Sequence, residues 1–228
     1  MKTATLPAIA LLCVLSLTSC VEVTGTPAEA AQDIVDRAAA TVERFATGKD
    51  EIGFTKYIAE ARAVVILPRA IKAGFLFGAE AGNGVLAVRG TDGAWSPPAF
   101  YSLAGASFGF QIGIQDVETV LIVRNEKAID AILEHQAKFG ADAGLTVGVL
   151  GAGVEAATTA NLDADVLAFT HAIVGAYGGV SFEGSALVRR KDLNEAYYGE
   201  GVTPQDIVRA GKHTNAKAAP LSAALAKF

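Results

Sequence analysis

The sequence predicts an α+β protein with an antiparallel, strongly curved or barrel-like sheet and a few flanking helices. Short apolar runs punctuated by Gly, Asn and Asp outnumber the helix-like segments. The two kinds of segment do not alternate regularly, as they would around a parallel sheet. In one run, Gly109 and Gly113 lie on the same face, which indicates a bent sheet or a close backbone neighbour.

The composition is typical of one compact globular domain. The chain has 228 residues, of which 51% are hydrophobic and 19% charged, and its formal net charge is −5. A chain of this length buries about 70% of its unfolded surface, so its core needs neither a structural metal nor disulfides. Because 24 acidic residues outnumber 19 basic ones, binding to nucleic acid is not expected.

The N-terminus has the features of an export signal. Lys2 precedes an apolar run, Leu6 to Leu17, that is short for crossing a bilayer. The run ends in Leu17-Thr-Ser-Cys20, which resembles the lipobox of bacterial lipoproteins. We therefore expect a signal peptide over residues 1–19 and a tether over 20–25, with Cys20 lipidated. An ordinary signal peptide and a membrane-spanning helix are the weaker alternatives.

Lipidation of Cys20 predicts a protein anchored to the cell envelope. Val21 follows the cysteine, where enterobacterial lipoproteins retained in the inner membrane carry an aspartate. By this analogy, the outer membrane is the expected location in a Gram-negative cell, with the domain facing the periplasm.

Residues 26–228 are expected to form a single domain that begins with a helix. Thr26 is the predicted N-cap, Pro27 the first helical residue and Glu29 the closing residue of a capping box. This helix should run to about Thr47, where Gly48 can end it. The same signals predict two more helices, over residues 125–140 and 203–211.

Most of the remaining chain is predicted to be strand. The clearest strand is 107–115, in which Phe108, Phe110, Ile112 and Ile114 share one face. The other predicted strands are Ala63–Leu67, Gly74–Gly78, Gly84–Arg89, Ala99–Leu103, Thr119–Arg124, Leu145–Leu150, Ala164–Thr170 and Val180–Val188.

One pattern suggests a serine hydrolase. Gly105-Ala-Ser107-Phe-Gly109 matches the nucleophile elbow, and the acids and histidine that follow it, Asp142, Asp163, Asp165 and His171, are in hydrolase order. The elbow requires a helix after the serine, whereas the residues after Ser107 alternate like a strand. A small residue in a packed strand is the stronger interpretation of Ser107, and the two later aspartates are best explained by a turn.

Other cofactor patterns are weaker still. Gly82-Asn-Gly84 imitates part of a dinucleotide fingerprint but precedes a strand, so a hairpin turn is the expected structure. The three histidines are far apart and provide no zinc template. We therefore expect no cofactor and no metal.

Positive charge gathers in several places. One cluster comprises Lys56, Arg62, Arg69 and Lys72, and Arg189-Arg190-Lys191 forms another. Each could be a solvated rim or a site for an anionic partner. Trp95 follows a Gly-containing turn, where its ring could meet a membrane interface or fold back over the sheet edge.

Three motifs carry a resemblance to a known family. They are Lys72-Ala-Gly-Phe75, Pro98-Ala-Phe-Tyr-Ser102 and Phe139-Gly-Ala-Asp-Ala-Gly144. Together with the segments around them, they closely resemble the SYLF domain family over nearly the whole chain after the signal. The resemblance implies a non-catalytic domain that binds membrane lipids, since eukaryotic members bind phosphoinositides and yeast members bind actin filaments.

The first helix departs from the eukaryotic members. Their lipid binding involves a basic amphipathic N-terminal segment, whereas residues 26–47 hold four acids and two arginines. The predicted lipid contacts are therefore elsewhere, at Lys56, Arg69, Lys72, Phe75, Trp95, Arg189, Arg190 and Lys191. The expected ligand is an anionic phospholipid, and the alternatives are an envelope scaffold that binds a protein or polymer and, less favoured, a hydrolase using Ser107.

Overall fold

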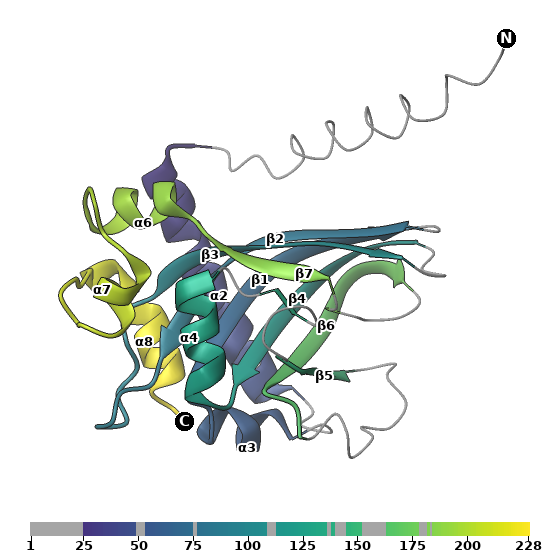
Figure 1. The fold of residues 1–228 in the computed structure, drawn as a ribbon, viewed down its shortest axis with the longest axis horizontal. Coiled ribbons are helices and arrows are strands. Elements are labelled where there is room, and N and C mark those ends of the chain that lie inside the picture. Colours follow the sequence, from purple (N-terminus) through teal and green to yellow (C-terminus); the bar gives the residue numbers. More distant parts are fainter. Residues whose placement is uncertain are drawn as a thin grey trace, which may run out of the picture.

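A seven-stranded, strongly curled sheet in a half-barrel arrangement forms the centre of the computed structural model (Figure 1). The predicted α+β class with a curved sheet is confirmed. The predicted signal peptide, Cys20 and Phe75 lie outside the residues that the structure describes. Those residues are 25–48, 53–74, 77–108, 113–135, 138–139, 145–151, 163–177, 182 and 184–228.

The strands follow one another across the sheet in the order β5-β6-β4-β1-β2-β3-β7. Neighbouring strands are antiparallel except β5 and β6, whose parallel pairing departs from the predicted pattern at that one edge. The strand bounds are β1 Ala63–Gly74, β2 Phe77–Val88, β3 Ala99–Phe108, β4 Gly113–Val123, β5 Val147–Gly151, β6 Val166–Tyr177 and β7 Ser185–Arg189.

Six α-helices are described, together with a 3₁₀ turn at Ala216–Ala218. The capping box predicted at Thr26 and Glu29 is present, and the predicted cap at Thr203 also forms. Helices α6 and α8 were not predicted from the sequence. The helix bounds are α2 Pro27–Thr47, α3 Phe54–Ala59, α4 Glu126–His135, α6 Lys191–Tyr198, α7 Pro204–Val208 and α8 Ala219–Leu225.

The helices lie on both faces of the sheet and bury a core on each. Helices α2, α3, α6 and α8 pack on what we call the outer face, where Ile66, Phe100 and Phe169 are buried. Helices α4 and α7 pack on the inner face, against a second cluster to which β7 contributes Leu187. The sheet curls around the inner face, so the outer face is convex (Figure 1).

A bulge in the central strand changes the direction of its side chains. The register of β1 with both neighbours shifts by one residue around Pro68, which has no N–H to donate to a neighbouring strand. The bulged backbone presses on β2, where a Cβ on Gly84 would lie 2.1 Å from the carbonyl oxygen of Ile66. The hairpin turn predicted at Gly82 and Gly84 is therefore wrong, because both glycines lie inside β2.

Two predicted strands actually span the connections between strands. Gly74 pairs with Gly78 across β1 and β2, so the chain reverses within the predicted strand 74–78. The predicted strand 107–115 contains both the end of β3 and the start of β4. Both errors have one cause, since alternation of side chains can continue through a hairpin even though the backbone turns back.

Candidate functional site

The predicted lipid-contacting residues do not share one surface. Lys72 is buried with only 3% of its side chain exposed, and it lies on the inner face. Its Nζ atom is 2.9 Å from Glu80 Oε2 and 3.9 Å from the ring centroid of Phe182. Glu80 also accepts a hydrogen bond from the hydroxyl of Ser185. Lys72 is thus part of a buried ion pair and not of an exposed patch.

Arg69 lies on the outer face, at the bulge in β1. Its Nε atom donates to Asp116 Oδ2 on β4 at 2.7 Å. The arginine side chain is 59% exposed and the aspartate side chain 21% exposed. The positively charged member of this pair is therefore the one that faces solvent.

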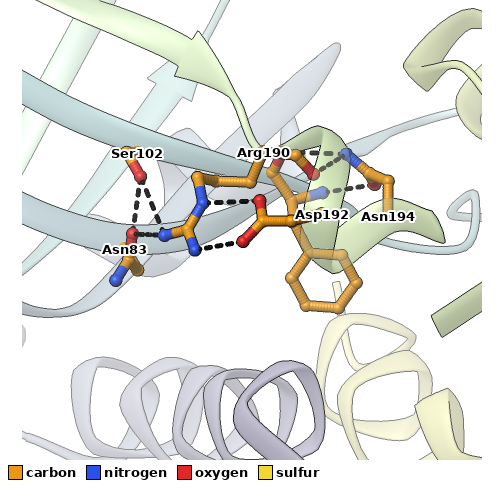
Figure 2. A network of polar contacts seen from close by, with 6 residues as sticks. Asn83, Ser102, Arg190, Asp192 and Asn194 are labelled. Carbon is orange, nitrogen blue, oxygen red and sulfur yellow. Dashed lines mark hydrogen bonds and ion pairs between the residues drawn. The ribbon is translucent and has the colours of Figure 1, made fainter. Parts of the chain in front are cut away.

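Arg190 connects the sheet to the start of α6. Figure 2 shows its guanidinium between Asn83 and Ser102 on one side and Asp192 on the other. It donates two hydrogen bonds to the Asp192 carboxylate, at 2.9 and 2.6 Å, and one of 2.7 Å to Asn83 Oδ1. The hydrogen bonds from Arg190 lower the pKa of the Asp192 carboxyl. In this pair the arginine is the more buried partner, with 26% of its side chain exposed against 53% for Asp192.

Asn194, in the same network, pairs with the backbone of β3. Its Nδ2 donates to the carbonyl of Phe100 at 3.1 Å, and its Oδ1 accepts from the Phe100 N–H at 2.9 Å. The carboxamide is buried and takes the place of a peptide unit just beyond the end of β7 (Figure 2).

The other three predicted cations are exposed but stand on separate elements. Lys56 is on α3, whereas Arg189 ends β7 and Lys191 begins α6. The Nζ atom of Lys191 lies 3.7 Å from Glu195 Oε1. Their predicted role in lipid binding stays a prediction.

Trp95 packs against the protein itself. Its ring is half-buried on the outer core cluster, and the Arg89 guanidinium carbon lies 4.4 Å from its centroid. Arg89 also donates to the carbonyl oxygens of Ala59 and Phe228. The structure therefore shows the tryptophan folded back over the sheet, which was one of its two predicted positions.

The candidate hydrolase residues do not form a catalytic arrangement. The backbone of Ser107 lies within β3 and pairs with Gly78, so it is not at a strand-to-helix elbow. His171 lies on β6, and three strands separate β6 from β3, which carries Ser107. The two strands are therefore about 19 Å apart along the sheet. Burial raises the pKa of Asp165, but hydrogen bonds from Thr146 and Asn125 lower it overall and show a structural role. Asp142 lies outside the described residues.

A polar cluster that the sequence did not indicate joins α2 to β4. The Glu118 carboxylate, only 3% exposed, accepts hydrogen bonds from Arg44 and from the Thr41 hydroxyl. The hydrogen bond to Glu118 raises the pKa of the Arg44 guanidinium. His171 Nδ1 lies 3.8 Å from the same carboxylate and is 63% exposed. Again the carboxylate is buried and its basic partners face solvent.

Beyond this cluster, an apolar part of the outer face is not covered by any described helix. The register places Ala106, Ala79, Ala73 and Ile114 in one row across four strands. The next row toward the helices contains Ala104, Ala81, Ile71 and Asp116. Ile114 is 69% exposed, the most of any large apolar side chain described. We call the seven apolar residues of these two rows the distal face.

The described residues offer no alternative metal centre. Among them, no group of three or more His, Cys, Asp or Glu side chains is placed to hold a metal ion. Within the same ranges, no helix is long and apolar enough to cross a membrane.

Comparisons with known proteins identify relatives of this domain. Residues 104–228 match the model of the Ysc84 family, described as "Las17-binding protein actin regulator". The chain is 32% identical over 163 residues to LAS seventeen-binding protein 3 of Saccharomyces cerevisiae. It is 35% identical over 162 residues to human SH3 domain-containing YSC84-like protein 1.

The matched region is one part of these longer relatives. Each alignment covers 71% of this chain, but only 35% of the yeast protein and 47% of the human protein. The family model covers more than half of this chain, and the resemblance predicted from the three sequence motifs is confirmed. The chain belongs to the Ysc84 family, the family of SYLF-domain proteins.

Proposed function

We propose that this chain is a non-catalytic lipid-binding domain of an envelope lipoprotein and that it contacts anionic phospholipid. The observation that carries the proposal is the distal face, an apolar surface left open to solvent on the outer side of the sheet. Contiguous exposed apolar surface is unfavourable in water and typically marks a site of interaction. Exposed arginines at its border suit a partner that carries negative charge.

In this proposal, acyl chains on Cys20 anchor the protein in the outer membrane, and the folded domain faces the periplasm. Acyl chains attach a protein to a bilayer without help from the folded domain. Lipid binding by the domain itself therefore has to be measured without the anchor.

The test is vesicle flotation of a chain that starts at Val21, which keeps every described element. Vesicles of phosphatidylcholine alone are compared with vesicles that contain phosphatidylglycerol, each at low and high salt. We expect flotation with the anionic vesicles, stronger at low salt because salt screens charge. The proposal fails if the chain stays at the bottom of the gradient under all four conditions.

A second candidate is an envelope scaffold that binds a protein. The yeast relative is named for binding Las17, and the family description names an actin regulator. In this alternative, the distal face meets a protein, and only the anchor contacts lipid. It predicts no flotation of the chain from Val21, together with reproducible recovery of one partner from an envelope extract.

A further inference from the structure

We infer that the distal face docks on the bilayer, with Ile114 in the apolar interface and the guanidiniums of Arg69 and Arg44 at headgroup level. This inference rests on the proposed function and specifies the surface that performs it. It differs from the lipid contacts predicted from the sequence, which were mostly separate basic residues. Here an apolar row of the sheet inserts first.

The outward side chains of β4 change from apolar to acidic toward the helices. Ile114, Asp116 and Glu118 point to the same face at intervals of two residues, or about 6.8 Å. Asp116 binds Arg69, and Glu118 binds Arg44. From the distal face toward the helices, the outer face of the sheet therefore changes from apolar to charged within about 14 Å.

The two partners of each ion pair differ in how much of the side chain is exposed. In both pairs the carboxylate is the more buried partner, with side-chain exposures of 21% for Asp116 and 3% for Glu118. The arginines are 59% and 54% exposed, so an approaching surface meets the guanidiniums first. An exposed apolar row bordered by exposed cations matches the two layers of an anionic membrane surface, hydrocarbon and headgroup.

The shape and charge of the outer face favour a bilayer over other occupants. The outer face is convex (Figure 1), and two convex surfaces touch over a smaller area than a convex and a deformable surface do. Asp116 is the one charged residue in the two rows, and Arg69 binds its carboxylate, so the rows offer a protein partner little charge to recognise. A fluid bilayer adapts to a convex surface and needs no matching shape.

A unique label measures insertion directly. Both cysteines of the sequence, Cys13 and Cys20, are absent from a chain that starts at Val21, so one introduced cysteine is the only thiol. An environment-sensitive fluorophore on Ile114→Cys should shift to the blue with vesicles of phosphatidylcholine and phosphatidylglycerol. The matched control is Ala223→Cys, an exposed position on α8, whose label should not respond.

Flotation of charged variants provides the second test. Ala106→Glu should weaken vesicle binding by about tenfold because it places a carboxylate in the docking row. Ala223→Glu adds the same charge at an exposed alanine of the helical layer and should change binding by less than about twofold. Circular dichroism checks that both variants stay folded.

The possible results separate an error in the docking surface from an error in the proposed lipid binding. If the unaltered chain floats but Ala106→Glu floats equally well, or the Ile114→Cys label stays in water, the docking surface is wrong and lipid binding stands. If the unaltered chain does not float, both are overturned. A blue shift that grows with protein concentration in the absence of vesicles would overturn the inference in favour of a second copy.

Discussion

The outer face of the sheet has two halves with opposite environments. Near the helices, Ile66, Val85, Phe100 and Val120 are fully buried under α2 and its neighbours. Toward the free end, the same strands carry Ala73, Ala79, Ala106 and Ile114, which no described helix covers. Large side chains therefore stand where a second layer covers the sheet, and mostly small ones where it does not.

This difference shows that one strand can serve two purposes. The first five residues of β1 are completely buried in the core. After the bulge at Pro68, the strand carries Arg69 and Ile71 on the outer face and Lys72 on the inner face. The helices bury the outer surface of the first half of the sheet, and no described helix covers the outer surface of the second half.

The largest expected effect is on stability. Phe169→Ala should lower the free energy of unfolding by about 4 kcal/mol, because the ring is fully buried and packs edge-on against Phe54. Ile114→Ala in the exposed half should change it by less than about 0.5 kcal/mol. Urea denaturation measures both. Similar losses for the two variants would show that the distal face is covered in solution.

A second prediction compares the two faces at the free end of the sheet. Lys72→Met should cost about 3 kcal/mol, since it leaves the carboxylate of Glu80 buried without its partner. Arg69→Met breaks an exposed pair and should cost less than about 1 kcal/mol.

The double variant Lys72→Met with Glu80→Gln removes both buried charges. It should recover part of the loss, which identifies the unpaired carboxylate as its cause. If Lys72→Met alone is as stable as the unaltered chain, the inner face at this end is hydrated rather than buried.

The smallest effect concerns pH and the cap of α7, on the inner face of the sheet. Hydrogen bonds from Thr203 and Lys212 lower the pKa of Asp206 to about 2. A carboxyl whose pKa is lowered by folding stabilises the fold above its unfolded pKa, and this contribution is lost as pH falls through the folded pKa. Stability should therefore fall between about pH 4 and about pH 2, and less steeply in Asp206→Asn. NMR titration of the carboxyl carbon gives the pKa itself, and a midpoint near 4 would contradict this prediction.

Local signals in the sequence predicted the starts of α2, α4 and α7 but not the faces of the strands. Thr26 and Glu29 sit within one helical turn, so their pairing depends only on nearby residues. The direction of Lys72 depends on the bulge at Pro68, which inserts one residue and moves the lysine to the inner face. Regular alternation, counted from Ile66, would have placed Lys72 on the outer face with the exposed residues.

The candidate site was hidden for a related reason. Ala73, Ala79 and Ala106 come from three different strands, and only the register of the folded sheet brings them into one row. Alanine is compatible with nearly any element, so none of these positions was informative alone. The motifs of the family could be recognised because they are contiguous in sequence.

The carboxamide of Asn194 also has a consequence for how the protein behaves at high concentration. Beyond the end of β7, the Phe100 carbonyl still accepts from the Arg190 N–H, but the Phe100 N–H would lack a partner at this edge of the sheet without Asn194. Asn194 occupies both hydrogen-bonding groups of Phe100 and closes that edge. Asn194 thus extends the edge protection given by β7 by one residue, which lowers the tendency of this edge to pair with another molecule.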